Sequence, residues 1–327
     1  MKDNYELLKY DKIFKDQESK GIIEEISLNT EASLAHYLPH HPVLTLAKTT
    51  TKVRIVYNAS SKVRKELKSL NDCLYRCPVS MPNLCGVLLR FRMHQVAIVA
   101  DIQKAFLPIS LNKADRDVTR FLWIKDLTKE IQISNLKIYR FQRVAFGVIS
   151  SPFPLTATVA HHSKEEEEEE CRQGRERQAN IIKDSLNDMY VDNFISGTKD
   201  VQRATENYEI IKNVFERASM NLKDWRLNSR GFKKQLNKTD CSKGNSIKIL
   251  GLIRQKGKKI LNIHLDDSSI SSNTLVNERQ IQQRLAKNHD PLGLLPSAIL
   301  PSKLPVQNIW HRRYNWDQPV PTEINLS

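Results

Sequence analysis

The alternation of apolar and polar positions predicts a chain of short helices and strands. Runs rich in Val, Ile and aromatic residues, which favour strands, lie between segments with apolar residues at helical spacing. In the first hundred residues, the pattern predicts a helix and a short strand within 5–28, a hairpin of 43–47 with 53–58, a helix at 81–91 with Pro82 in its first turn, and a strand at 96–100. Further on, it predicts strands at 118–124 and 131–140, a helix from Ser151-Pro152 through Ala160, and an amphipathic helix at 203–220.

One stretch breaks this pattern. Lys164 is followed by six glutamates, Glu165 to Glu170. A run of like charge repels itself and buries no apolar surface, so we expect a solvated loop or a frayed helix there, with no assigned function. Beyond Asn221 the chain becomes basic and then rich in proline, which predicts a change of subdomain near residue 225.

Charge narrows the choice of partner. The chain of 327 residues is long enough for two or three small domains, and at 40% hydrophobic residues it can bury a core. Its net charge is +14 and its pI is near 9.5. The segment 222–260 contains twelve Lys and Arg residues against Asp224 and Asp240. Because neutralising phosphates releases condensed counterions, this excess favours a nucleic-acid partner. A solvated, lysine-rich loop is the competing interpretation.

Several classes of protein are not supported. The N-terminus shows no apolar core of a secretory signal, and no apolar stretch is long enough to span a membrane. The five cysteines form no CxxC pair and lack zinc-ligand spacing, so we expect reduced thiols in an intracellular, cytoplasmic protein. Neither a nucleophile elbow nor a P-loop motif is present.

The candidate chemistry lies at two aspartates. Asp101 ends the apolar run 96–100, and Phe106 follows five residues later. Asp192 lies in Tyr190–Asn193, a predicted strand–turn–strand. Carboxylates at the end of a buried strand and in a tight turn are typical of a polymerase palm, where two Mg²⁺ ions activate a primer 3′-hydroxyl and hold the leaving pyrophosphate. A lone aspartate after an apolar run is more often a strand cap, so this assignment depends on the accompanying motifs.

Seven such motifs occur in order along the chain: Tyr37–Val43, Thr50–Ser60, Ser69–Asp72, Asp101–Phe106, Phe146–Phe153, Tyr190–Asn193 and Leu250–Leu252. With them, the sequence resembles the reverse transcriptase region of BEL/Pao-type LTR retrotransposon Pol polyproteins. The late segments Asp290–Leu295 and Trp310–Asp317 are similar to that family just after the thumb. The resemblance covers nearly the whole chain.

The resemblance implies a right-hand α+β polymerase fold, in which the palm is an antiparallel sheet backed by helices. It implies fingers and palm at 1–225, a basic thumb-like segment at 226–300, and the start of a connection region at 301–327 that ends before any ribonuclease H. The implied function is RNA-directed DNA synthesis with two Mg²⁺ ions, or Mn²⁺ in their place. The implied partners are an RNA or DNA template–primer, dNTPs and the rest of the Pol polyprotein, in the cytoplasm or in virus-like particles, with no membrane.

The same resemblance implies roles for individual residues. Asp101, Asp192 and Asn193 would be the catalytic residues, and Asp101, Asp192 and the Ile102 carbonyl the metal ligands. Substrate contacts are expected at Lys52, Arg54, Phe106, Gly147 and Tyr190, with Phe106 as the aromatic gate against a ribose 2′-hydroxyl. Nucleic-acid contacts are expected at Ser151, Pro152, Lys223, Trp225, Leu250 and Gly251.

Three departures from the family pattern leave alternatives open. Asn193 replaces the usual second Asp, so we expect reduced rather than absent activity, since an amide brings no charge to the metal. The stretch 162–181 is acidic and of low complexity, and Leu250–Arg254 lacks the usual tryptophan. The alternatives are a catalytically weak or inactive nucleic-acid-binding remnant of the same fold, and a degraded reading frame that does not fold stably. Core packing is the competing role for Phe106.

Overall fold

The computed structural model describes residues 4–44, 53–78, 81–229, 231, 236–237, 239–242, 247–254, 259–263, 276–288 and 290–320. The chain divides into two compact units. Unit 1 comprises Met1–Met81, Ile102–Leu186 and Ile211–Asn221, and unit 2 comprises Pro82–Asp101, Asn187–Ile210 and Leu222–Ser327. The units are interleaved along the sequence. The bounds of fingers and palm, thumb-like segment and connection region stay a prediction from the resemblance. None of the described helices is long and apolar enough to cross a membrane.

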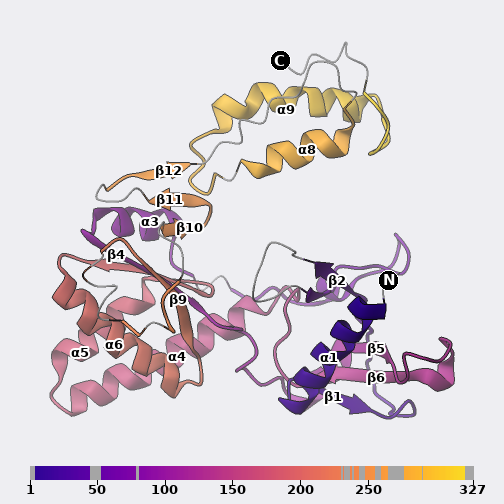
Figure 1. The fold of residues 1–327 in the computed structure, drawn as a ribbon, viewed down its shortest axis with the longest axis horizontal. Helices are drawn as coiled ribbons and strands as arrows, with labels where there is room; N and C mark the ends of the chain where they lie inside the picture. Colours follow the sequence, from indigo (N-terminus) through magenta and orange to yellow (C-terminus); the bar gives the residue numbers. More distant parts are fainter. Residues whose placement is uncertain are drawn as a thin grey trace. The chain divides into compact units, whose positions relative to one another are not determined.

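Unit 1 contains two antiparallel sheets (Figure 1). The first has the order β1-β6-β5, from β1 (Ile23–Ile26), β6 (Leu136–Phe141) and β5 (Arg120–Ile124), and the second is the hairpin of β2 (His40–Leu44) and β3 (Val53–Tyr57). Its helices are α1 (Asn4–Ser19), α2 (Leu70–Cys73), α4 (Pro152–Arg172), α5 (Glu176–Leu186) and the end of α6 (Val201–Arg217), with the 3₁₀ turns η1 (Lys113–Thr119) and η2 (Ile133–Asn135). The predicted pairing of the two hairpin strands is confirmed, but β2 begins at His40, before the predicted start at Val43, and residues 45–52 lie outside the described residues.

An aromatic cluster forms the core of unit 1. Phe14 of α1 is fully buried, and its ring centroid lies 5.2 Å from that of Phe121 and 4.7 Å from that of Trp123. The Trp123 indole donates a hydrogen bond to Asp11 Oδ1 over 2.9 Å, so its polar edge has a partner inside the core. The predicted opening helix is confirmed, because its apolar face packs on strand residues of this unit.

Unit 2 also contains two sheets (Figure 1). The larger has the order β7-β8-β4-β9, from β7 (Met189–Tyr190), β8 (Asn193–Thr198), β4 (Val96–Ile102) and β9 (Leu222–Leu227). The smaller has the order β10-β11-β12, from β10 (Ile247–Ile249), β11 (Leu252–Arg254) and β12 (Leu261–Ile263). The described helices of this unit are α3 (Leu84–Met93), the first part of α6, α8 (Glu278–Lys287) and α9 (Pro296–His311).

The two faces of the larger sheet have different partners. Ala97 of β4 and Ile195 of β8 belong to an apolar cluster with α3 and the smaller sheet. Phe194, the neighbour of Ile195, points to the opposite face because successive strand residues alternate. There its ring lies 6.1 Å from Trp225 of β9, which in turn lies 4.7 Å from Tyr208 of α6. Both faces are therefore covered, which explains why the predicted strand at 96–100 is apolar throughout.

The starts of α3 and β6 differ from the predictions. α3 begins at Leu84 after the N-cap Asn83, whose side chain accepts a hydrogen bond from Gly86 N over 3.1 Å. Pro82 therefore precedes the helix instead of lying in its first turn. The strand predicted at 131–140 begins only at Leu136, because the residues before it form η2.

The glutamate run is helical. Glu165–Glu170 lie in α4, which extends well past the predicted end at Ala160. Arg217 donates to both carboxylate oxygens of Glu166, over 2.8 Å in one case, and Arg175 pairs with the buried Glu170. The prediction of a solvated loop or frayed helix is wrong, because cations from other segments of unit 1 offset the self-repulsion of the run.

Candidate active site

Pairing of β4 with β8 brings the predicted catalytic residues together. Asp101 lies directly opposite Asn193 in the antiparallel register. β7 and β8 form a hairpin in which Tyr190 pairs with Asn193, leaving Val191 and Asp192 as its two-residue turn. Val191 has φ +57°, a conformation that β-branched residues rarely adopt and that the flanking pairing imposes. The predicted strand–turn–strand is confirmed.

Hydrogen bonds and charges link these groups. Asn193 Nδ2 donates to Asp192 Oδ1 over 2.8 Å, and Arg226 Nη2 donates to Asp101 Oδ2 over 3.0 Å. Burial raises the pKa of Asp101 above its usual range, the Arg226 charge opposes this rise, and the Asp192 charge adds to it. The other Asp101 oxygen, Oδ1, is buried and has no hydrogen-bond partner among the described residues.

These residues fit a divalent cation. A buried carboxylate oxygen without a donor, close to a second negative charge, is an arrangement that a hard cation stabilises. Asp101 and Asp192 would hold the ion, and Ile102, the predicted backbone ligand, follows Asp101 directly in β4. Within the described part of the chain, no group of three or more His, Cys, Asp or Glu side chains is placed to hold a metal. Two carboxylates would therefore carry most of the compensating charge.

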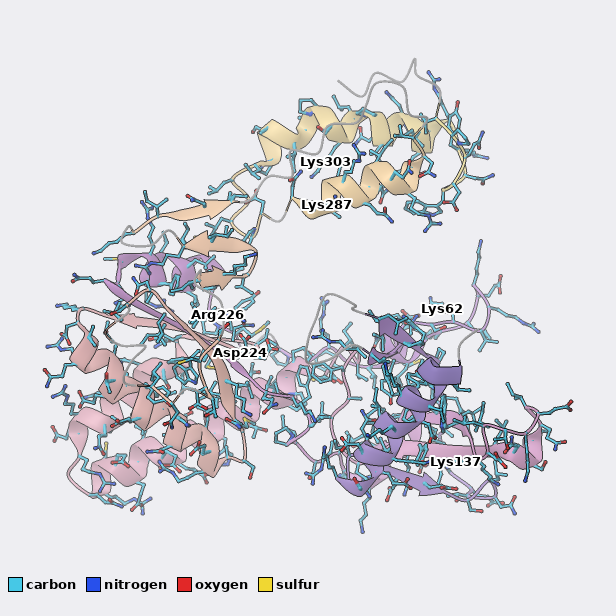
Figure 2. The ribbon with its side chains drawn as sticks, in the orientation of Figure 1. Lys62, Lys137, Asp224, Arg226, Lys287 and Lys303 are labelled. Atoms are coloured by element: carbon cyan, nitrogen blue, oxygen red, sulfur yellow. The ribbon has the colours of Figure 1, made fainter. Side chains whose placement is uncertain are left out.

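Arg226 is a residue of this site that the sequence did not single out. It lies on β9, where its guanidinium also donates to the Lys248 carbonyl over 3.2 Å. Asp224 lies on the same strand, is exposed, and adds negative charge that raises the pKa of Asp101 further (Figure 2). The polar–Trp225–polar alternation along β9 is the signal that could have placed both polar side chains on one face.

Unit 1 carries most of the predicted substrate contacts. Arg54 is exposed on β3, whereas Lys52 lies outside the described residues. The Phe106 ring is 7% exposed and meets the Phe146 ring edge-on, with centroids 4.6 Å apart. Phe106 thus has the packing partner expected of a core residue, and its role as a steric gate stays a prediction.

Asn71 fixes the turn that contains Gly147. Its side-chain amide donates to the Gly147 carbonyl over 3.1 Å, and its Oδ1 accepts from Ile149 N over 2.9 Å. Gly147 has φ +88°, and a Cβ on it would lie 2.7 Å from the Tyr57 carbonyl oxygen. A contact inside unit 1 therefore accounts for a glycine at this position, where the sequence analysis expected a substrate contact.

The predicted nucleic-acid contacts differ in exposure. Ser151 is buried, and its hydroxyl donates to the Ala145 carbonyl over 2.6 Å. Trp225 is 1% exposed, and its indole N–H donates to the Leu222 carbonyl over 3.1 Å. Both side chains belong to the core, which argues against a contact between these side chains and nucleic acid. The roles of the two residues stay predictions. Of the others, Pro152 begins α4, Lys223 is half-buried on β9, and Leu250 and Gly251 form the turn between β10 and β11 with φ +43° and +82°.

Two solved structures have a fold similar to that of this chain. A structure of the foamy viral protease-reverse transcriptase dRH in complex with dsDNA aligns with a TM-score of 0.59 and 15% identity over 96% of this chain and 45% of that chain. A foamy viral protease-reverse transcriptase in complex with dsDNA aligns with a TM-score of 0.57 and 12% identity over 96% of this chain and 53% of that chain. The chain therefore has a mixed α/β fold similar to that of a retroviral Pol protein. This chain spans about half the length of these two relatives.

A comparison of sequences also points to retroelements. Residues 277–327 match the family described as Pao retrotransposon-like RNaseH-like domain, and no curated protein matches the chain. Together, the matches relate this chain to the Pol region of retroelements. The matched stretch contains all of α8 and α9, where the sequence analysis expected the end of the thumb-like segment and the connection region, without a ribonuclease H.

Proposed function

We propose that this chain is the RNA-directed DNA polymerase module of a retroelement Pol protein, with fingers and palm before the basic segment. The observation that carries the proposal is the placement of Asp101 across from the Asp192–Asn193 turn, within a fold shared with foamy viral protease-reverse transcriptases. Two divalent ions bound by these carboxylates, Mg²⁺ or Mn²⁺, would supply activation of a primer 3′-hydroxyl and charge stabilisation of the leaving pyrophosphate.

The protein groups have separable roles in this proposal. Asp101 and Asp192 supply the negative charge, and Asn193 orients Asp192 through its 2.8 Å hydrogen bond. Arg226 holds Asp101 before a cation binds. Tyr190 packs against the apolar cluster beneath the turn and so supports its position.

The substrate and template contacts complete the proposal. Arg54, exposed on β3, binds the triphosphate of an incoming dNTP, for which its planar guanidinium is suited. Phe106 excludes the ribose 2′-hydroxyl. Lys223 and the Leu250–Gly251 turn follow the backbone of an RNA or DNA template–primer. The net charge of +14 and the duplex DNA bound by both foamy viral proteins support this partner.

A nucleic-acid-binding remnant without useful catalysis is the second candidate. The observation that favours it is the small negative charge of the site. Two carboxylates, Asp101 and Asp192, are placed to hold a cation, and Arg226 already donates a hydrogen bond to one oxygen of Asp101. Such a protein would bind template–primer in the same place but hold divalent cations weakly.

Primer extension on an RNA template, with dNTPs and Mg²⁺, tests the proposal. The decisive variant is Asp101→Asn, and Asp224→Asn is its matched control. Both changes remove one carboxylate charge without changing side-chain size, and Asn tolerates the φ of +55° at residue 224. We expect extension to fall by at least about a thousandfold in Asp101→Asn and by less than about threefold in Asp224→Asn.

The outcomes separate the two candidates. Extension by the wild type that is lost only in Asp101→Asn supports the polymerase. Salt-sensitive template–primer binding without extension supports the remnant. Equal loss in both variants would refute a specific role for Asp101, because general electrostatics would then explain the effect.

A further inference from the structure

We propose an anion-binding site in unit 2 that takes a phosphate group and lies at the opposite end of the larger sheet from Asp101. A cleft of about 650 Å³ opens there, beside Val96 at the start of β4. Asp101 lies near the other end of the same strand, which places it roughly 16 Å away. The cleft is therefore distinct from the candidate active site.

Arg254 is the central residue of the cleft. It is 3% exposed, and its guanidinium donates to the carbonyls of Phe91, over 2.5 Å, and His94, while lying 4.9 Å above the Phe91 ring. Its Nε is buried and has no hydrogen-bond partner among the described residues. No carboxylate of the described chain pairs with this charge. A buried, uncompensated cation is costly, so an anion in the adjoining cleft would be stabilised by it.

The surrounding groups add positive potential. Lys199 and Lys259 line the cleft and are exposed. Val201, the first residue of α6, also lines it, so the positive end of that helix dipole faces the same space. Asp200 is the carboxylate in the lining, but it caps α6 by accepting from Arg203 N over 2.8 Å and pairs with the Arg203 side chain. Three cations thus face one carboxylate that is already engaged.

This donor set suits a phosphate group. A buried guanidinium, two exposed ammonium groups and a helix N-terminus together offer the charge-assisted hydrogen bonds that phosphate oxygens accept. The cleft is large enough for a phosphate that carries an organic group, so the phosphate could belong to a free nucleotide or to a nucleic-acid strand. Binding there requires neither a divalent cation nor catalysis, so it stands or falls independently of the proposed polymerase activity.

Calorimetric titration of the purified full chain tests this site. Inorganic phosphate is the first probe, at constant ionic strength and without divalent cations, followed by dATP and a single-stranded oligonucleotide. The test variant is Lys199→Gln/Lys259→Gln, which leaves Arg254 and its structural hydrogen bonds in place. The matched control is Lys113→Gln/Lys303→Gln, which removes two exposed lysines elsewhere (Figure 2 labels Lys303).

We expect phosphate affinity to fall at least about tenfold in the cleft variant and to change by less than about twofold in the control. Phosphate should also raise the melting temperature of the wild type but not of the cleft variant, because only the folded state offers the site. If the cleft variant binds dATP more weakly than the wild type but binds the oligonucleotide equally well, the phosphate belongs to a free nucleotide. If the cleft variant also binds the oligonucleotide more weakly, the phosphate belongs to a nucleic-acid strand. Equal affinity in the two double variants, or no saturable phosphate binding by the wild type, would overturn the proposal.

Discussion

Asn193 faces Asp101 across two strands and donates its amide hydrogen to Asp192. Asn193→Asp would replace that hydrogen bond with repulsion between carboxylates. Without divalent cations we expect the variant to lose about 1–2 kcal/mol of stability. With Mg²⁺ present we expect about tenfold tighter cation binding, because a third carboxylate would then share the charge.

Thermal unfolding with and without Mg²⁺ measures both effects. The matched control is Asn262→Asp, which adds the same charge at an exposed position on β12. A melting temperature that drops without Mg²⁺ and recovers with it only in Asn193→Asp supports the site. Identical Mg²⁺ responses in the two variants would contradict it.

Arg226 also affects the binding of Mg²⁺ at Asp101, because its positive charge competes with the cation. Its guanidinium occupies Asp101 Oδ2 and opposes the rise in the pKa of Asp101 that burial causes. Arg226→Gln keeps a hydrogen-bond donor but removes the competing charge. We expect the Mg²⁺ concentration for half-maximal extension to fall about threefold to tenfold.

The control for this prediction is Arg279→Gln, which breaks another arginine–aspartate pair, with Asp317, on the surface of the C-terminal helices. It should leave the Mg²⁺ requirement unchanged. A higher Mg²⁺ requirement in Arg226→Gln would mean that Arg226 positions Asp101 for the cation and does not compete with it.

At the scale of elements, α4 depends on long-range pairs along its glutamate run. Glu166 is 16% exposed and receives both hydrogen bonds of Arg217, which lies at the end of α6. Glu168 is 60% exposed and its nearest cation, Lys164 Nζ, is 3.9 Å away. Glu166→Gln should therefore cost about 1–2 kcal/mol of unfolding free energy, and Glu168→Gln less than about 0.5 kcal/mol.

Urea unfolding followed by circular dichroism measures this difference. The two substitutions have the same chemistry and lie in the same helix, so helix propensity and the removal of repulsion within the run affect both alike. Equal stability changes would mean that the run is held by its own helix and not by α6.

The elements that sequence patterns predicted well are those whose determinants are local. The Tyr190–Asn193 hairpin and the α1 helix follow from residues that are neighbours in the chain. The glutamate helix does not, because its partner Arg217 is remote in sequence. The local sequence does not predict burial either. Trp225 was predicted to contact nucleic acid because basic residues surround it in the sequence, whereas its packing against Phe194 and Tyr208 places it in the core.

The sequence predicted the two aspartates of the candidate site but not the arginines. Asp101 and Asp192 could be found because each ends or interrupts an apolar run, a pattern that survives at the level of sequence. Arg226 and Arg254 could not, since a count of basic residues does not distinguish an arginine at a carboxylate from one buried beneath a cleft. Arg254 entered the sequence analysis only as one of the basic residues of 222–260 and as the last residue of the stretch Leu250–Arg254. Its role depends on α3 carbonyls that pairing of distant segments supplies.

At the scale of the whole molecule, the charge balance predicts how nucleic acid should bind. The chain carries +14, and the segment 222–260 contributes most of this excess. If template–primer binding depends on phosphate contacts, the logarithm of the affinity should fall linearly with the logarithm of salt concentration. Lys223→Gln should reduce the magnitude of that slope by about 1, because one phosphate contact is lost whatever the template sequence.

Fluorescence anisotropy with a labelled RNA–DNA template–primer, over a series of salt concentrations, gives these slopes. Lys303→Gln, an equal charge change on α9, is the control and should leave the slope of the wild type unchanged. A common reduction in both variants would indicate diffuse attraction by net charge, without a contact at Lys223. A wild-type affinity independent of salt would remove nucleic acid as the partner of the basic segment. The lysines there would then be a solvated surface, because phosphate contacts cannot form without releasing counterions.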